Sequence, residues 1–206
     1  GDHRDLHSFP TRRSSDLVTG GTAGNLSIAD YNTLTGLTSD DSFGYSIVDT
    51  AANLLANGSA APLTGAAAVS VTGGEAGNLS ISDYNTLTGL TSDDSFGYSI
   101  VDAAASLLDP ANAAIVSGAA AVSVTGGEAG NLSIADYNAR TALTTDDSFG
   151  YSIVDSAANL LANGAGAPLT DADAVSVTGG AAGNLSIADY NALTGLTSDD
   201  SFGYSI

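Results

Sequence analysis

The sequence predicts an α/β repeat protein, a parallel β/α solenoid in which short strands and helices alternate along the chain. Three observations predict this fold class. The segment GNLSI recurs at a fixed spacing of 53 residues. Each 53-residue unit contains two short runs in which apolar residues alternate with serine, the pattern of a β-strand. Between these runs lie Ala- and Leu-rich segments with the capping residues of helices.

The repeat defines the organisation of the chain. GNLSI begins at Gly24, Gly77, Gly130 and Gly183. The repeats accordingly cover residues 18–70, 71–123 and 124–176, with a partial fourth repeat at 177–206. We expect all four to belong to one solenoid domain, in which neighbouring repeats supply the core that no single repeat can enclose.

The two strand-like runs have the sequences AVSVTG, as at Ala68–Gly73, and GYSIVD, as at Gly97–Asp102. Their central serines follow one another at alternating steps of 24 and 29 residues. Steps of 20 to 30 residues are typical of single coils of a β/α solenoid such as the leucine-rich repeats. Each repeat is therefore predicted to form two leucine-rich-repeat-like coils, whose strands stack about 4.8 Å apart.

Two helices per repeat are expected. Residues 49–58 begin with Asp49, a good N-cap residue, and end at Gly58, which suits the end of a helix. Residues 27–37 carry Tyr31, Leu34 and Leu37 at a spacing of three, so this segment is predicted as a short or partly 3₁₀ helix. LSI before it is a further strand candidate, and TGGEAGN and TSDDSFG are expected to be loops.

Residues 1–17 differ from the rest of the chain. They hold both histidines and three of the four basic residues, and they resemble the in-frame translation of a short-read sequencing adapter. We expect a non-native, disordered segment and exclude it from fold arguments. We also expect the chain to be a fragment of a longer protein, since the repeat pattern is interrupted at Val18 and Ile206.

Residues 18–206 carry 20 acidic residues and a single basic residue, Arg140. A chain of this charge repels nucleic acid and anionic lipid, and no apolar run is long enough to span a membrane. We therefore expect neither nucleic-acid binding nor membrane insertion. Residues 18–206 also lack His, Cys and Lys, which supply most nucleophiles and bases. The Asp-Asp pairs recur in every repeat, whereas an active site is a single asymmetric pocket, so we expect no enzyme and no obligatory cofactor.

Calcium binding is the metal chemistry that the acidic loops suggest, because Ca²⁺ prefers carboxylate, carbonyl and hydroxyl oxygens. The candidate ligands are the Asp-Asp pairs of the four repeats: Asp40, Asp41, Asp93, Asp94, Asp146, Asp147, Asp199 and Asp200. Asp30, Asp49 and their equivalents are further candidates. The loops lack the ligand spacing of an EF-hand. The alternative interpretation is a solvated acidic loop in which Asp caps a helix.

Other side chains have both a functional and a structural interpretation. Asn25, Asn78, Asn131, Asn184 and Asn57 match the N-glycosylation sequon, although the same asparagines can cap or form ladders. Tyr31, Phe43 and Tyr45 suit either a sugar-stacking stripe or core packing, and the latter is preferred. Thr33, Thr35 and Thr38 suggest a regular hydroxyl face of the kind that ice-binding solenoids use.

The segments VDTAANLLA at Val48–Ala56 and VDSAANLLA at Val154–Ala162 resemble the DTAANL-type tandem repeats of very large bacterial surface and secreted proteins. The second repeat departs from this motif with VDAAASLLD. The similar proteins are adhesin-like and often carry calcium-binding nonapeptide (RTX) repeats nearby. The resemblance implies an extracellular or cell-surface location and a repetitive spacer without catalytic residues.

These observations together predict a structural or adhesive stalk in a large bacterial surface or secreted protein. Its partners would be neighbouring repeats of the same chain. One alternative function is a repeat array that binds Ca²⁺ or the glycans of a cell surface or matrix. The other is a self-associating subunit of an extracellular filament.

Overall fold

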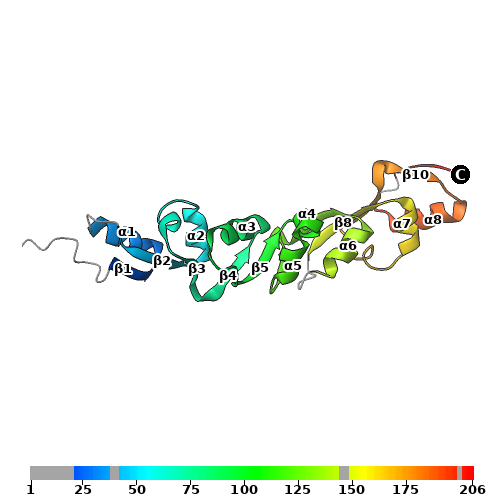
Figure 1. The fold of residues 1–206 in the computed structure, drawn as a ribbon. Helices are drawn as coiled ribbons and strands as arrows, with labels where there is room; N and C mark the ends of the chain where they lie inside the picture. Colours follow the sequence, from blue (N-terminus) through cyan, green and yellow to red (C-terminus); the bar gives the residue numbers. More distant parts are fainter. Residues whose placement is uncertain (1–20, 38–41, 144–148, 199–200) are drawn as a thin grey trace, which may run out of the picture. The chain divides into compact units, whose positions relative to one another are not determined.

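The computed structural model describes residues 21–37, 42–143, 149–198 and 201–206. Each complete repeat follows the order strand, helix, strand, helix, strand (Figure 1). The chain is therefore an α/β protein in which small parallel sheets alternate with helices. Residues 1–17, predicted to be a non-native segment, lie outside the described residues, as does Thr38 of the predicted hydroxyl face.

Three strands belong to each complete repeat. The first strands are β1 (Thr22–Leu26), β4 (Glu75–Leu79), β7 (Glu128–Leu132) and β10 (Ala181–Asn184). The second strands are β2 (Gly44–Asp49), β5 (Gly97–Asp102), β8 (Gly150–Asp155) and β11 (Gly203–Ser205). The third strands are β3 (Val69–Val71), β6 (Val122–Val124) and β9 (Ala174–Val177).

The two predicted helices are present. The first helix of each repeat is α1 (Ile28–Leu37), α3 (Ile81–Leu90), α6 (Ile134–Thr141) or α8 (Ile187–Leu196). The second is α2 (Ala51–Asn57), α4 (Ala104–Leu108) or α7 (Ala157–Asn163). The second repeat has one additional helix, α5 (Ala113–Gly118). Short 3₁₀ turns occur at η3 (Leu63–Gly65), η4 (Thr72–Gly74), η5 (Pro110–Asn112), η6 (Thr125–Gly127) and η7 (Thr178–Gly180).

The strand pairs β1–β2, β2–β3, β5–β6, β7–β8, β8–β9 and β10–β11 are parallel. The first and third repeats have the strand orders β1-β2-β3 and β7-β8-β9, so the second strand is central and the other two are edges. In the second repeat, the first strand, β4, begins directly after a tight turn in which Gly73 and Gly74 both have φ of 72°. Glycine is favoured there because side chains disfavour positive φ.

Two details of the strand prediction were wrong. The segment EAGNL, expected to be part of a loop, is the first strand, and LSI is not a strand because Leu79 ends β4 and helix α3 begins at Ile81. In the register of β2 and β3, Ser70 lies opposite Val48. A repeat thus contributes three strands to its sheet instead of the two that a two-coil repeat predicts.

The described chain divides into two compact units. One comprises residues up to Gly77 together with Asp83–Gly97, and the other comprises Asn78–Ser82 and Tyr98–Ile206. In the first unit Ile47, Leu54 and Leu87 are completely buried.

The second unit has a hydrophobic core shared between repeats. It runs from Ala104 of the second repeat, through Ile153 and Leu160 of the third, to Leu193 and Phe202 of the fourth. Helix α4 packs against α6, and α7 packs against α8, so the second helix of one repeat contacts the first helix of the next. These repeats therefore depend on each other for burial, as expected of a repeat protein.

Candidate functional site

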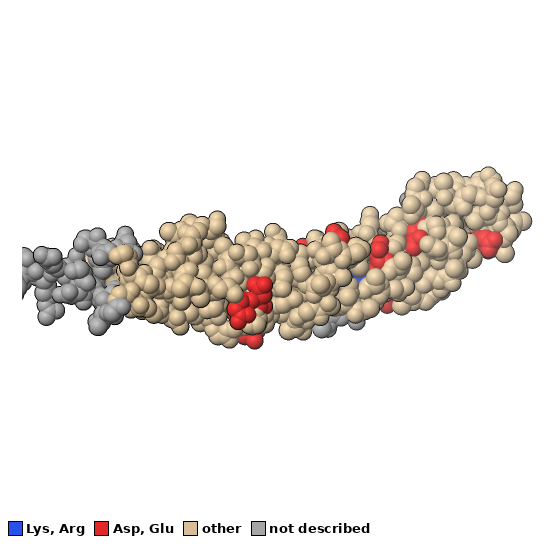
Figure 2. All heavy atoms as spheres, in the orientation of Figure 1, with Lys and Arg blue, Asp and Glu red and all other residues tan. Residues whose placement is uncertain are grey.

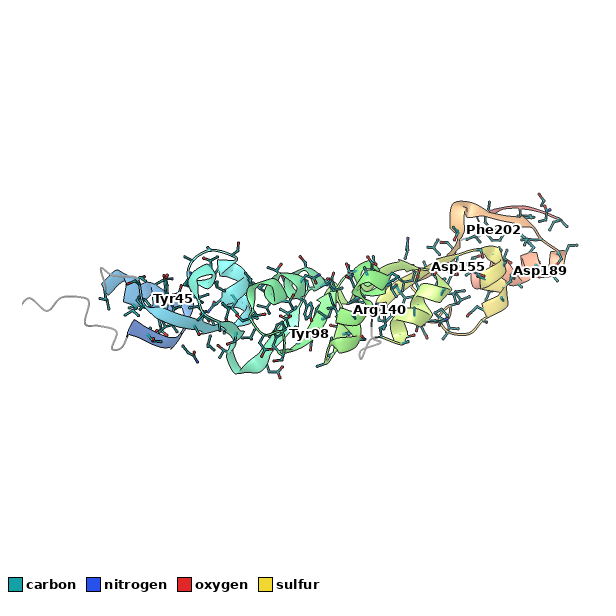
Figure 3. The ribbon with its side chains drawn as sticks, viewed as in Figure 1. Tyr45, Tyr98, Arg140, Asp155, Asp189 and Phe202 are labelled. Atoms are coloured by element: carbon teal, nitrogen blue, oxygen red, sulfur yellow. The ribbon has the colours of Figure 1, made fainter. Side chains whose placement is uncertain are left out.

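The last residue of the second strand, Asp49, connects the two helices of its repeat. Its Oδ2 atom accepts a hydrogen bond from the backbone N–H of Ile28, the first residue of α1, at 2.9 Å. Its Oδ1 atom accepts from the N–H of Thr50 at 2.8 Å and from Nδ2 of Asn53 at 2.7 Å. The third repeat has the same arrangement at Asp155 (Figure 3), with Ile134, Ser156 and Asn159 as donors.

The carboxylate of Asp49 is ionised despite being buried, with a relative exposure of 6%. Burial raises the pKa of Asp49, but the hydrogen bonds from Asn53, Ile28 and Thr50 outweigh it and hold the pKa below its usual value. The pKa of Asp155 is lowered by the same balance of burial and hydrogen bonds. The negative charge also lies beside the N-terminus of a helix, where it is favoured.

The predicted role of Asp49 as the helix N-cap was wrong by one residue. The N-cap of α2 is Thr50, whose hydroxyl accepts a hydrogen bond from the N–H of Asn53. The end of the helix was predicted correctly, because Gly58 is the C-cap and its N–H donates to the carbonyl oxygen of Leu54. Asp49 instead remains in the strand, where its side chain reaches both helices.

A groove lined by both polar and apolar groups lies beside each of these two carboxylates. Its volume is about 370 Å³ in the first repeat and about 370 Å³ in the third. The polar residues that line it are Asn32, Asp49, Asn53 and Asn57 in one, and Asn138, Asp155, Asn159 and Asn163 in the other. Of these asparagines, only Asn57 is considered from the sequence, as a glycosylation sequon. The recurrence of the others in the first and third repeats was a signal that could have found them.

The second repeat differs at the positions that define this groove. Ala103, Ser106 and Pro110 stand where the first repeat has Thr50, Asn53 and Asn57. Asp102 still accepts from the N–H groups of Ile81 at 2.9 Å and Ala103 at 2.7 Å. The carboxylate bridge between the helices is thus kept in the second repeat, but the asparagine side chains around it are not.

The Asp-Asp pair of the second repeat lies in an exposed loop. Oδ1 of Asp93 accepts from the N–H of Ser95 at 3.0 Å, and Oδ1 of Asp94 accepts from the hydroxyl of Thr91 at 3.3 Å. The hydrogen bonds from the Ser95 hydroxyl and N–H lower the pKa of Asp93. Within residues 21–37, 42–143, 149–198 and 201–206, no three acidic, His or Cys side chains are grouped to hold a metal ion.

The remaining predicted calcium ligands, Asp40, Asp41, Asp146, Asp147, Asp199 and Asp200, lie outside the described residues. Calcium binding at the Asp-Asp pairs therefore stays a prediction. Figure 2 shows acidic side chains at several places on the visible face, without a single dominant acidic patch.

The serine before this pair joins two repeats. The hydroxyl of Ser92 accepts from the N–H of Val69 at 2.9 Å, and the N–H of Ser92 donates to the carbonyl oxygen of Val69, also at 2.9 Å. Ser198 makes the same two bonds to Val175, at 2.8 and 2.9 Å. The acidic loop thus has a structural role, because its serine pairs with the third strand of the preceding repeat.

Asp30 of the first helix is also used structurally. The hydroxyl of Ser27 accepts from the N–H of Asp30 at 3.0 Å and donates to its carboxylate at 2.8 Å. The same pair occurs as Ser133 with Asp136 and as Ser186 with Asp189 (Figure 3). This pairing satisfies one of the free N–H groups at the start of the helix, that of the aspartate.

The aromatic side chains of the first repeat pack at the core, as preferred from the sequence, whereas Tyr204 near the end of the chain is exposed. Phe43 and Tyr45 are buried, with ring centroids 5.7 Å apart, and Tyr31 lies 4.7 Å from Tyr45. The Tyr45 hydroxyl donates to the carbonyl oxygen of Pro62 at 2.8 Å. Burial and then the neighbouring Tyr31 raise the pKa of Tyr45 to about 12. Buried rings of this kind leave no face on which a sugar could stack.

The sequon asparagines divide into two groups. Asn25, Asn78, Asn131 and Asn184 are exposed on the first strands, whereas Asn57 donates from Nδ2 to the carbonyl oxygens of Gly58 and Ala60. Glycosylation at any of them stays a prediction.

Comparison of the chain with family models, curated proteins and solved structures gave no match. Within the part of the chain that the structure describes, no helix has both the length and the apolar character needed to cross a membrane.

Proposed function

We propose that this chain is a non-catalytic spacer in a large bacterial cell-surface or secreted protein, in which successive repeats stack as coils of a solenoid. The observation that carries the proposal is the sharing of structure between repeats. A single core joins residues of the second, third and fourth repeats, and Ser92 and Ser198 each bond to the repeat before them. Such nearest-neighbour dependence allows length to change by whole repeats.

The use of the acidic side chains agrees with a structural function. Asp49, Asp155 and Asp93 accept hydrogen bonds from nearby backbone N–H groups, and the carboxylate of Asp30 accepts one from the Ser27 hydroxyl. These carboxylates therefore hold helices and loops in place, and the proposal assigns them no catalytic step. The resemblance of VDTAANLLA to repeats of bacterial surface proteins supports an extracellular location, and the net charge of −19 disfavours nucleic-acid partners.

The experiment that tests the spacer is a series of variants in which the second repeat, residues 71–123, is deleted or duplicated in tandem. Small-angle X-ray scattering gives the maximum dimension of each variant. Three strands per repeat, spaced by about 4.8 Å within a sheet, predict a constant increment of at least roughly 14 Å per repeat, because the sheets of successive repeats are separate. A radius of gyration that stays near the roughly 17 Å of a compact 206-residue protein would contradict the proposal.

A further inference from the structure

We propose that the grooves beside Asp49 and Asp155 are binding sites for neutral saccharides, one in the first repeat and one in the third. The observation is the same groove in two repeats, lined by one buried carboxylate, three asparagine side chains and three apolar side chains. This inference goes beyond the spacer function and does not rest on it.

The asparagine side chains leave groups available for a ligand. Asn53 and Asn57 use their Nδ2 groups within the protein, for Asp49 and for the carbonyl oxygens of Gly58 and Ala60. Their Oδ1 atoms accept no hydrogen bond from the described residues, and both side chains line the groove. Asn32 is exposed and its side chain makes no hydrogen bond to the described chain. The groove therefore offers amide oxygens as acceptors and the Asn32 amide as both donor and acceptor.

This set of groups favours hydroxyl-bearing, uncharged ligands. A hydroxyl both donates and accepts, which matches an array of amides beside a carboxylate. Anionic ligands are disfavoured by Asp49 and by the net charge of −19. A volume of about 370 Å³ lies in the range of small-molecule sites, and Ile28 and Ala29 add a small apolar surface for the carbon face of a sugar ring.

The second repeat provides a matched control. Asn85 stands at the position of Asn32, but Ser106 and Pro110 replace the other two asparagines of the groove. A saccharide that depends on the full amide set should bind the first and third repeats and leave the second unaffected.

The test uses the full chain and three neutral disaccharides, maltose, cellobiose and diacetylchitobiose, followed by ¹⁵N NMR of the asparagine side-chain amides. Millimolar titration with at least one of them should shift the amide signals of Asn32, Asn57, Asn138 and Asn163. The double substitution Asn32→Ala and Asn138→Ala should weaken the apparent Kd about 3- to 10-fold, as expected for one lost hydrogen bond per site. Asn85→Ala should leave the Kd unchanged.

These substitutions remove exposed amides that make no hydrogen bond within the described chain, so both variants should keep the backbone NMR spectrum of the parent chain. The proposal is overturned if none of the three disaccharides shifts a groove amide. It is equally overturned if shifts occur but Asn85→Ala weakens binding as much as the double substitution. Shifts with a lysine oligopeptide alone would assign the groove to a cationic peptide and would also refute the saccharide site.

Discussion

Asp49 shows how one side chain can organise a whole repeat. It accepts hydrogen bonds from the first residue of α1, from the N-cap of α2 and from a side chain within α2. These donors are 21 residues, one residue and four residues away in sequence, so a single carboxylate fixes the relative position of both helices at the end of the strand. The third repeat keeps the whole arrangement, and the second keeps only its two backbone contacts.

We predict that Asp49→Asn lowers the free energy of unfolding by about 2 kcal/mol, because an amide places an N–H₂ group against N–H donors in a buried position. The matched substitution Asp102→Asn should cost less, since Asp102 is half-buried and has no asparagine partner at the position of Asn53. Urea denaturation of the two variants measures the difference. Equal losses of stability in the two variants would show that neither the Asn53 hydrogen bond nor the deeper burial of Asp49 adds to the stability.

The carboxylates of Asp49 and Asp155 predict that the folded chain loses stability at acid pH. The folded pKa values of Asp49 and Asp155 lie below that of an unfolded Asp, which is about 3.9. Their contribution to stability is therefore fully present above pH 4 and is lost as the pH falls through the folded pKa. In variants with Asn at both positions the stability should depend less steeply on pH below 4, as measured by urea denaturation at several pH values.

Arg140 is the single basic residue of residues 18–206, and it is completely buried. Its guanidinium carbon lies 3.7 Å from the centroid of the Phe149 ring, a cation–π contact. At the matching position the other repeats carry leucine, and Leu87 and Leu193 are completely buried. The third repeat thus places a charge where the other repeats have an apolar core side chain.

We predict that Arg140→Leu raises the free energy of unfolding by about 1–3 kcal/mol, because leucine is the completely buried residue at this position in the second and fourth repeats and has no charge to desolvate. The reverse change in the second repeat, Leu87→Arg, should be destabilising. Thermal and urea denaturation of both variants measures the effects. A loss of stability in Arg140→Leu would indicate that the arginine stabilises the third repeat through its contacts.

At the scale of elements, the predictions from sequence succeeded where the local pattern is strong. The alternating runs GYSIVD and AVSV form the second and third strands, and the capped Ala- and Leu-rich segment forms α2. They failed for EAGNL, because glycine and asparagine are rare in strands and the apolar alternation is weak. That segment becomes a strand because β2 or its equivalent provides a parallel partner for its backbone, as in the pairing of Asn25 with Ser46.

The junction between elements of different repeats gives a further prediction. Ser92→Ala leaves the N–H of Val69 without its hydroxyl acceptor and should lower the free energy of unfolding by about 1–2 kcal/mol. Ser59→Ala, a change at an exposed serine, serves as the control and should have little effect. Urea denaturation gives the stability, and hydrogen exchange at Val69 should increase in the first variant only.

For the whole molecule, the dominant property is its charge. Residues 18–206 carry twenty acidic residues and one basic residue. The acidic residues repel one another, and salt screens that repulsion. Asp93 and Asp94 each accept a hydrogen bond within their own loop through one carboxylate oxygen. Within the described residues they belong to no larger group of metal-ligating side chains. At these two described carboxylates, divalent cations should therefore act mainly by screening.

We predict that Ca²⁺ and Mg²⁺ at equal millimolar concentrations raise the thermal midpoint equally, because a screening effect does not distinguish two ions of the same charge. Differential scanning calorimetry measures the midpoints. A larger rise with Ca²⁺, abolished by Asp93→Asn together with Asp94→Asn, would instead establish the calcium site at the second repeat.

The sequence by itself determined the 53-residue period, the positions of both helices and of two strands, and the excess of negative charge, because these are local patterns or plain composition. Only the tertiary structure decided that EAGNL is a strand, that Asp49 connects two helices, and that three asparagines line one groove. The physical reason is that each of these depends on a partner distant in sequence. The first strand of a repeat takes its hydrogen bonds from a neighbouring strand. Asp49 accepts a hydrogen bond from the Ile28 N–H of helix α1, and the asparagine groove forms where α1 lies beside α2.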